Sequence, residues 1–200
     1  MFDEGVFIDH LYEMGAVRFG EFTLRSGAVS PIYIDLRMLI SRPAMVRDAG
    51  VALFEKTRGC DYDLVSGVPY AALPIATALS ISYDIPMIIK RKEVKAYGTR
   101  KEIEGAFCEG DVCLVIDDLI TSGTSVTEVL EGLERGGVVV KDVAVIIDRK
   151  QGGVARLVER GHTVHALFTL PDLVDRLEGR GKIDAGTASR VREYLQLCPG

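Results

Sequence analysis

Two adjacent carboxylates, Asp117 and Asp118, come shortly before a run of small hydroxyl residues that contains one glycine, Gly123. Helical spacing of apolar residues begins directly afterwards, at about Ser125. A loop of this composition at the start of a helix can hold an anion. Successive backbone N–H groups point at one spot there, and the glycine has no Cβ to block a phosphate. Four side chains can add hydroxyl donors: Thr121, Ser122, Thr124 and Ser125.

The two acids would repel the phosphate that this loop attracts, so they are expected to face another part of the ligand. Vicinal hydroxyls or a cation would satisfy them, and a sugar phosphate offers both kinds of group. The alternative is a plain strand-to-helix turn in which Asp and Thr serve only as caps. The density of small residues directly after Asp117 and Asp118 favours a binding site.

A buried strand and an amphipathic helix must position these residues. Residues 112–116 are all apolar, which is typical of a strand buried on both faces of a parallel sheet, and the acids follow where that strand should end. Further strands are predicted around residues 64–65, 86–89, 142–147 and 162–168. Helices are predicted at about 3–14, 43–56, 154–160, 171–178 and 184–197, with one ending near 80 and one beginning near 125. This alternation predicts an α/β fold with a doubly wound parallel sheet and sites at the carboxyl ends of its strands.

Three other stretches could contact a ligand. A hairpin over residues 22–35 carries Arg25 beside its turn and Tyr33 on its second strand, and could cover a planar anion or simply expose the arginine. A glycine-containing loop at 66–74 is either a second anion site or a tight turn before a packed helix. Six of the sixteen residues in 90–105 are basic, a pattern that usually marks a solvated loop. Arg149 follows a predicted strand, and the simple alternative for it is a surface pair with Asp148.

The composition suits one globular domain of 200 residues, with 48% hydrophobic content. A net charge of −5 argues against a nucleic-acid surface, and no apolar run approaches the ~20 residues of a membrane span. An acidic N-terminus predicts no signal or transit peptide. Free thiols are expected for the cysteines, and therefore a cytoplasmic protein. His162 and His165 lack a third ligand nearby in the sequence, so no metal site is expected there.

The stretch Val-Ile-Asp-Asp-Leu-Ile-Thr-Ser-Gly-Thr-Ser, residues 115–125, resembles the diphosphoribose-binding motif of type I phosphoribosyltransferases. It lacks the Gly-Lys-Ser/Thr ending of a Walker loop. The resemblance implies that the loop at 121–125 holds a 5′-phosphate and that Asp117 and Asp118 hold the ribose hydroxyls, with Leu119 and Ile120 in the same motif. It also implies Mg²⁺ as cofactor, bound mainly through the diphosphate and through water to Asp117, with no direct protein ligand.

The hairpin resembles the N-terminal signature of orotate phosphoribosyltransferases, although that family often has lysine where Arg25 stands. By this resemblance Arg25 reaches the substrate region. The residues that then contact orotate are Tyr33, Ile34, Thr121 and Arg149. Arg149 would use its planar fork of donors, which suits a carboxylate or carbonyl.

The remaining two loops resemble the pyrophosphate loop and the mobile catalytic loop of the same family. Tyr70 and Ala71 carry over to the first, with alanine where many bacterial relatives have lysine. In the second, Ala96 stands in place of a more usual Asp and Tyr97 in place of a histidine. The implied ligand-binding residues of that second loop are Arg91, Lys92, Lys95 and Tyr97, with Lys92 and Lys95 catalytic beside Asp117 and Asp118, and with Lys95 at the leaving group.

The resemblance covers nearly the whole chain and is strongest to the phosphoribosyltransferase half of animal-type bifunctional UMP synthase. It implies a core at about 41–169 beneath a small hood from about 1–40 and 170–200. It also implies formation of orotidine 5′-monophosphate and pyrophosphate from orotate and 5-phosphoribosyl 1-diphosphate, in a homodimer with a shared active site. A transferase for another base and a non-catalytic regulator are the alternatives, and both a complete enzyme and half of a larger one stay open.

Overall fold

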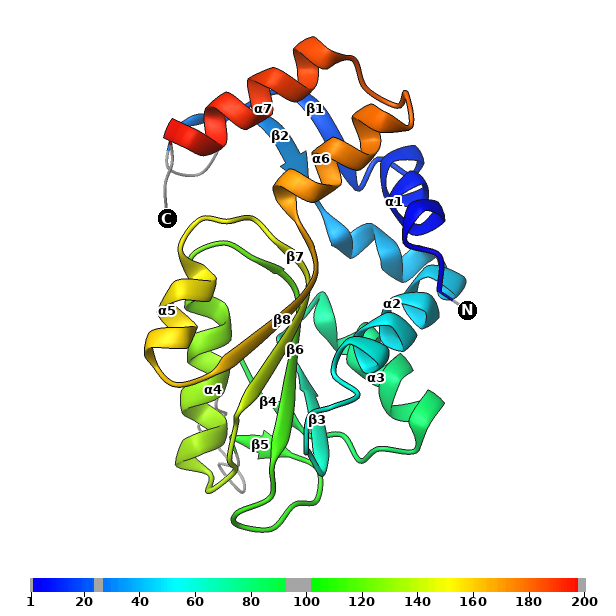
Figure 1. Cartoon of the computed structure of the whole chain (residues 1–200). Helices are drawn as coiled ribbons and strands as arrows, with labels where there is room; N and C mark the ends of the chain where they lie inside the picture. The colour runs from blue at the N-terminus through cyan, green and yellow to red at the C-terminus, as the bar shows by residue number, and fades with distance from the viewer. Residues whose placement is uncertain (1, 24–26, 93–101, 198–200) are drawn as a thin grey trace.

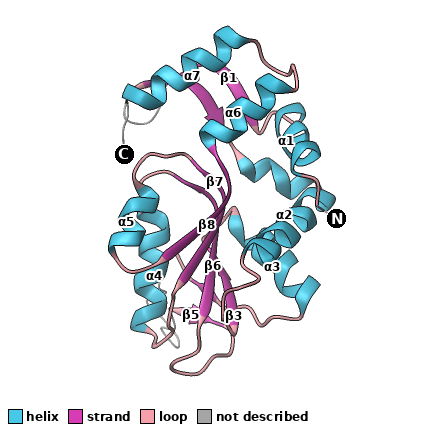
Figure 2. Cartoon of the chain, in the orientation of Figure 1, coloured by secondary structure: helices cyan, strands magenta, loops and turns pink. Residues whose placement is uncertain are grey.

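The computed structural model describes residues 2–23, 27–92 and 102–197 (Figure 1). Its centre is a four-stranded parallel sheet in the order β3-β6-β7-β8. These strands span Leu64–Gly67, Cys113–Ile120, Asp142–Asp148 and Thr163–Thr169. Helices α2 and α3 lie on one side of the sheet and α4 and α5 on the other (Figure 2), with bounds Pro43–Lys56, Ala72–Tyr83, Thr124–Arg135 and Gly153–Glu159. The predicted doubly wound α/β fold is confirmed.

The two central strands owe their position to their apolar sequence. Cys113 to Ile116 in β6 and Val143 to Ile147 in β7 are fully buried, as a strand covered by helices on both faces must be. Helix α4 adds its apolar stripe from one side, with Val126, Val129, Leu130 and Leu133 all buried. This packing holds the carboxyl ends of β6 and β7 rigidly side by side.

A second group of elements lies beyond the carboxyl ends of the strands (Figure 1). It consists of α1, the antiparallel pair β1 and β2, α6 and α7, with bounds Glu4–Glu13, Val17–Thr23, Val29–Ile34, Leu170–Gly179 and Ala185–Leu197. We refer to these elements as the hood. Ion pairs tie its two chain segments together: Lys182 to Glu13 at 2.7 Å, Arg176 to Glu4 at 2.7 Å, and Arg180 to Asp9. A 3₁₀ helix, η1 (Leu36–Ser41), connects β2 to α2.

Two predictions about strands need correction. Strand β6 does not end before the acids but runs through Asp117 and Asp118 to Ile120, because its pairing with β7 continues to the end of that strand. Residues 86–89 do not form a regular strand of the main sheet. Met87 makes a single bridge to Val65, and the chain then turns away as β4 (Ile89–Lys90), antiparallel to β5 (Ile103–Glu104).

Among the described helices, none combines the length and the apolar character that crossing a bilayer would require.

Candidate active site

The acid pair lies near the carboxyl end of β6, where the sheet meets the hood. Asp117 is 6% exposed, and its Oδ1 accepts the backbone N–H of Asp118 at 2.9 Å. Burial, and then the charge of Asp118, raise the pKa of Asp117 well above its usual range. Burial also raises the pKa of Asp118. Two carboxylates kept this close in a buried place favour a ligand that donates hydrogen bonds or brings positive charge.

The loop after β6 forms a small hollow. Its volume is about 100 Å³. Helix α4 begins at Thr124. No side chain in the described part of the chain caps its first turn, so its backbone N–H groups face the hollow without a side-chain acceptor. The hydroxyls of Ser122 and Thr124 lie 3.0 Å apart at its rim. An uncapped helix start with added hydroxyls is suited to a phosphate. The hollow is lined by Asp117, Leu119, Ile120, Thr121, Ser122, Gly123, Thr124, Ser125 and Val126.

Gly123 is needed for a reason beyond leaving space for a phosphate. Its φ of +76° is a conformation that favours glycine, and a Cβ there would lie 3.2 Å from the carbonyl oxygen of Gly153. Gly153 in turn donates its N–H to the carbonyl of Thr121 at 2.8 Å. A Cβ on Gly153 would lie only 2.5 Å from that oxygen and 2.8 Å from the N of Gly123. The start of α5 therefore shapes the loop at residues 121–125.

The contribution of Gly153 was not recognised from the sequence. Its close approach depends on how β6 and β7 lie in the sheet, and the glycine pair at 152–153 was the only local signal.

Arg149 follows β7, and its side chain is directed toward the protein interior. Its Nε and Nη2 are buried and have no hydrogen-bond partner in the part of the chain that the structure describes. Burial lowers the pKa of this arginine, the direction expected for a charge without compensation. The alternative of a surface pair with Asp148 is wrong, because Asp148 binds the Nζ of Lys150 at 3.1 Å and its backbone N–H at 2.8 Å. The guanidinium is thus available for a planar anionic ligand.

The second loop lies next to the acid pair. Strands β3 and β6 are parallel neighbours, and Val68 just after β3 donates its N–H to the carbonyl of Ile116 at 2.8 Å. Tyr70 follows, 66% exposed, and Ala71 stands at the start of α3 without a side-chain cap. Among the described residues no side chain caps the start of α3, so its first-turn N–H groups lie at the same edge of the sheet without a side-chain acceptor.

Lys92, two residues after β4, lies against this second loop. The Nζ of Lys92 lies 5.4 Å from the centre of the Tyr70 ring, within the range of a cation–π contact. Arg91 is instead held by Glu104 of β5, with Nη1 to Oε1 at 2.9 Å. Lys92 is therefore freer than Arg91 to meet a ligand above Tyr70. Lys95 and Tyr97, like Arg25 of the hairpin, lie outside the described residues.

Tyr33 and Ile34 lie on β2 of the hood with different surroundings. Tyr33 is half-buried. Its ring is tilted against that of Phe22, with 5.5 Å between the ring centres, and the guanidinium of Arg18 lies 4.9 Å from its centre. Ile34 is only 8% exposed and belongs to the core, so its backbone rather than its side chain would have to meet a ligand.

Asp35 and Arg37, at the start of the 3₁₀ helix η1, are additional charged groups near the acids. Two hydrogen bonds join them, Nε to Oδ1 at 2.6 Å and Nη2 to Oδ2 at 2.7 Å. Asp35 contributes to the raised pKa of Asp118, and Asp118 is among the groups that raise the pKa of Arg37. No local pattern signals this approach, because Asp35 and Asp118 are 83 positions apart in the chain (118 − 35).

The acid pair also suits a magnesium ion that is bound mainly through water and a phosphorylated ligand. Mg²⁺ prefers hard oxygen ligands and keeps several waters, so one or two carboxylates and a phosphorylated ligand suffice. Asp117 supplies a buried carboxylate at the edge of the hollow after β6. A cation nearby would lower the pKa of the pair, which burial raises.

A phosphoribosyl transferase domain family matches residues 41–161, which include β3, the acid pair and the hollow formed by the loop after β6. Fold and match together define a phosphoribosyltransferase, and the chain belongs to that family. Among its relatives, orotate phosphoribosyltransferase of Caenorhabditis elegans is 42% identical over 94% of this chain and 83% of that protein. Within the family, the chain belongs with the orotate phosphoribosyltransferases.

Larger relatives contain the same unit. Uridine 5′-monophosphate synthase of Bos taurus is 44% identical over 96% of this chain, which spans 40% of that protein. The solved structure of Leishmania donovani UMP synthase superposes with a TM-score of 0.88 at 35% identity, covering 96% of this chain and 42% of that one. The chain thus spans less than half of these two UMP synthases and most of the nematode transferase.

Proposed function

We propose that the chain transfers the phosphoribosyl group of 5-phosphoribosyl 1-diphosphate to orotate, which yields orotidine 5′-monophosphate and pyrophosphate. This is the phosphoribosyl step of de novo UMP biosynthesis. The names of the relatives and the family match support the reaction class. The observation that carries the choice of orotate is Arg149, whose buried Nε and Nη2 have no partner among the described residues. Orotate carries a carboxylate in the ring plane, and a guanidinium fork binds such a group with two parallel hydrogen bonds.

The sugar phosphate would occupy the edge formed by β6. The 5′-phosphate caps the start of α4 in the hollow of residues 121–125, where backbone N–H groups and hydroxyls can donate to it. The ribose hydroxyls donate to Asp117 and Asp118, which lie at the adjacent positions of the same strand. The diphosphate then faces the loop of Tyr70 and Ala71 on the neighbouring strand β3.

Catalysis at this site would be mainly electrostatic. Breaking the bond at C1′ leaves a sugar with oxocarbenium character, and the acid pair lies where that positive charge develops. Orotate N1 is already anionic when bound, which lessens the need for a general base. The bound Mg²⁺ would supply charge neutralisation on the departing diphosphate. Lys92 above Tyr70 can bind the same negative charge from the protein side.

Several further features are proposed from the family resemblance. Arg25 and Tyr33 would close over the base, Ile34 would meet it through its backbone, and Lys95 and Tyr97 would close over the diphosphate. The enzyme would be a homodimer in which the segment carrying Lys95 reaches the partner's site. We propose a cytoplasmic enzyme with small-molecule substrates and without nucleic-acid or membrane partners.

A spectrophotometric assay of base consumption tests the proposal. Orotate, uracil and hypoxanthine are each supplied with 5-phosphoribosyl 1-diphosphate, with and without Mg²⁺. We expect consumption of orotate alone, and only with Mg²⁺. Consumption of uracil or hypoxanthine at a comparable rate would assign the site to another base, and no consumption of any base would indicate a regulator.

A further inference from the structure

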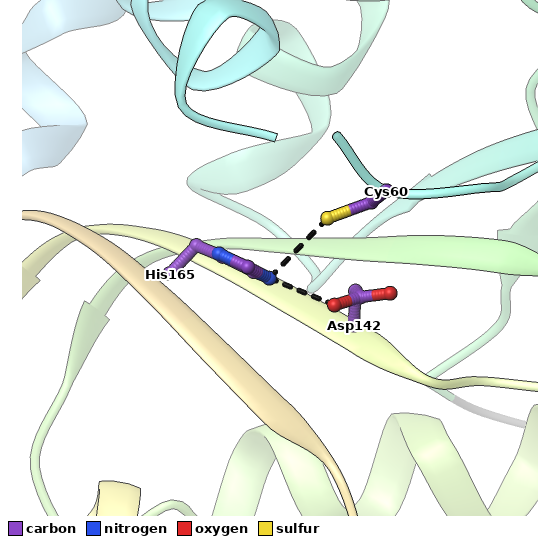
Figure 3. Close-up of side chains that lie close together, drawn as sticks. All are labelled: Cys60, Asp142 and His165. Carbon is purple, nitrogen blue, oxygen red and sulfur yellow. Dashed lines mark hydrogen bonds and ion pairs between the residues drawn. The ribbon is translucent and has the colours of Figure 1, made fainter. Parts of the chain in front are cut away.

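Three side chains from separate segments meet at the amino-terminal edge of the sheet, opposite the acid pair. Cys60 lies between α2 and β3, Asp142 begins β7, and His165 is the third residue of β8 (Figure 3). The His165 Nε2 lies 3.4 Å from the Sγ of Cys60 and 2.7 Å from the Oδ1 of Asp142. All three ligand atoms lie within 4.8 Å of one another.

In space, therefore, His165 has two candidate co-ligands, although none lies near it in the sequence. Its neighbours are 23 and 105 residues away in the chain, so sequence spacing could not reveal them. His162 is turned elsewhere, with its Nδ1 3.0 Å from the carbonyl oxygen of Val140.

Nε2 of His165 can make only one of its two contacts as a hydrogen bond, although the thiol of Cys60 can donate to Asp142 instead. Outside its ring, Nε2 offers either one N–H or one lone pair. If it donates to Asp142, it cannot also accept from the thiol of Cys60, and if it accepts from the thiol, it faces the carboxylate with a lone pair. A cation at the meeting point would receive electron pairs from all three atoms.

The arrangement differs from that of a catalytic triad. In a triad the carboxylate orients the histidine through the ring nitrogen remote from the nucleophile, whereas here Asp142 and Cys60 approach the same nitrogen. Burial, together with the charge of Asp142, raises the pKa of the Cys60 thiol, which is unfavourable for a free nucleophile. Metal coordination would displace the thiol proton to solvent, because the thiolate is the ligand.

We propose that Cys60, Asp142 and His165 form a binding site for a zinc-like divalent transition-metal ion, with water as the fourth ligand. Thiolate, imidazole and carboxylate together are a zinc ligand set, whereas Mg²⁺ would not select a thiolate. Ordinary Zn–S and Zn–N bonds in a tetrahedron place S and N about 3.6 Å apart, close to the 3.4 Å seen here. The Asp142 oxygen would have to move away from Nε2 by about 0.6 Å.

The site is held in place before any ion binds. Cys60 donates its N–H to the carbonyl of Thr57 at 2.9 Å, which fixes the turn after α2. On the other side Asp63 accepts the N–H of Val112 at 2.9 Å. Asp142 and Ala144 pair with Thr163 and His165, so the two strand ligands project from the same face of the sheet. Side chains of His165 and Asp142 are 21% and 15% exposed, which leaves access for an ion and a water.

A metal here would link the α2–β3 connection to β7 and β8, far from the substrate edge. Its expected effect is on stability, because an ion that binds only the folded chain raises the unfolding midpoint with concentration. This inference is independent of the proposed transferase activity, since no ligand of the ion belongs to that site.

Cobalt titration of the full chain tests the proposal. The reduced, metal-free protein is titrated with CoCl₂ and then with ZnCl₂. Absorption is followed for the thiolate-to-cobalt charge-transfer band, and thermal unfolding is followed with and without zinc. Variants Cys60→Ser, Asp142→Asn and His165→Gln each remove one ligand. Cys108→Ser and His10→Gln are matched controls, because both positions are exposed in the structure.

We expect one cobalt per chain, displaced by zinc, in the unaltered protein and both controls. The charge-transfer band should vanish in Cys60→Ser. Zinc affinity should fall in Asp142→Asn and His165→Gln by more than the 10- to 100-fold that loss of an outer-shell partner alone causes. Zinc should raise the unfolding midpoint of the unaltered chain and not of His165→Gln. No charge-transfer band in the unaltered protein, or an undiminished band in Cys60→Ser, would overturn the site. If one variant fails to fold by circular dichroism, the other two carry the comparison.

Discussion

Arg149 donates its backbone N–H to the carbonyl oxygen of Ile120 at 3.1 Å. Ile120 is the last residue of the strand that carries Asp117 and Asp118, and Arg149 comes directly after the strand beside it. The backbone of the arginine is therefore fixed relative to the acid pair by the sheet itself. A base held by the guanidinium and a ribose held by the acids would share one rigid frame.

Replacement of Arg149 by lysine keeps the charge and removes the planar fork. A lost charge-assisted hydrogen bond of about 1.5–3 kcal/mol should raise the KM for orotate roughly 10- to 100-fold, and the KM for the diphosphate substrate much less. Steady-state kinetics with each substrate varied in turn measures the difference. Arg156→Lys, at an exposed position of α5, is the control and should change neither constant. Equal rises in both constants would mean that Arg149 supports the structure and does not read the base.

Replacement of Asp117 and Asp118 by asparagine keeps size and hydrogen-bonding capacity but removes the charge. If the pair stabilises the sugar as positive charge develops, turnover should fall by well over ~10-fold, the scale of one lost electrostatic contact. Full activity in the double variant would show that the acids are only part of the turn.

The stability of this same variant should depend on pH in a defined direction. A carboxyl whose folded pKa is raised, as burial raises that of Asp117, contributes stability that is complete below its unfolded pKa of about 4 and is lost as pH rises through the folded pKa. The asparagine variant has no such loss. Its unfolding midpoint should therefore rise relative to that of the unaltered protein as pH increases above about 4, the ordinary pKa of the unfolded carboxyl. A difference that stays constant or shrinks over this range would contradict the raised pKa.

Gly153→Ala should distort the loop at residues 121–125, although residue 153 is not itself one of the proposed ligand contacts. The new Cβ would lie 2.5 Å from the carbonyl oxygen of Thr121, so the loop must shift. We expect kcat/KM for the diphosphate substrate to fall roughly 10- to 100-fold, because small displacements of positioning groups have effects of that size. Gly179→Ala is the matched control, since nothing lies within 4 Å of its added Cβ. Similar kinetics in the two variants would show that the α5 start does not shape the loop.

The proposed shared site of a homodimer can be tested by mixing two inactive chains. Lys95→Ala and the Asp117→Asn/Asp118→Asn chain should each be nearly inactive alone. After mixing and exchange, about half of the dimers are hybrids by random pairing, each with one intact site if Lys95 acts in the partner's site. Activity per chain should then recover to at most roughly a quarter of the unaltered value. Hybrids that form, as shown by native mass spectrometry, but stay inactive would place Lys95 in its own subunit's site.

The sequence predicted those parts of the structure that depend on local pattern. Helix α2 begins and ends where its apolar spacing and Pro43 place it, and the apolar runs of β6 and β7 predict central buried strands. The predicted end of β6 was wrong because pairing with β7, a non-local interaction, continues the strand through two charged residues. The strand predicted at 86–89 was overestimated for the same reason. Among the described residues Met87 makes one bridge to the main sheet, and β4 pairs with β5 instead.

Features that join distant segments could not be read from spacing. Lys150, rather than Arg149, binds Asp148, and this choice depends on how the chain turns after β7. The approach of Gly153 to the phosphate loop and of Cys60 to His165 requires the assembled sheet. Residue type suggested the chemistry of the acid pair and the hydroxyl loop, and only the fold brings Arg149 and Tyr70 to the same edge.

Phosphorus NMR of one reaction mixture tests the central claim most directly. The protein is incubated with orotate, 5-phosphoribosyl 1-diphosphate and Mg²⁺, and the products are followed over time. The account predicts that the resonances of the 5′-phosphate monoester of orotidine and of free pyrophosphate appear in equal amounts, and only when orotate is present. Release of pyrophosphate at the same rate without orotate, or an unchanged diphosphate substrate when all components are present, would contradict it.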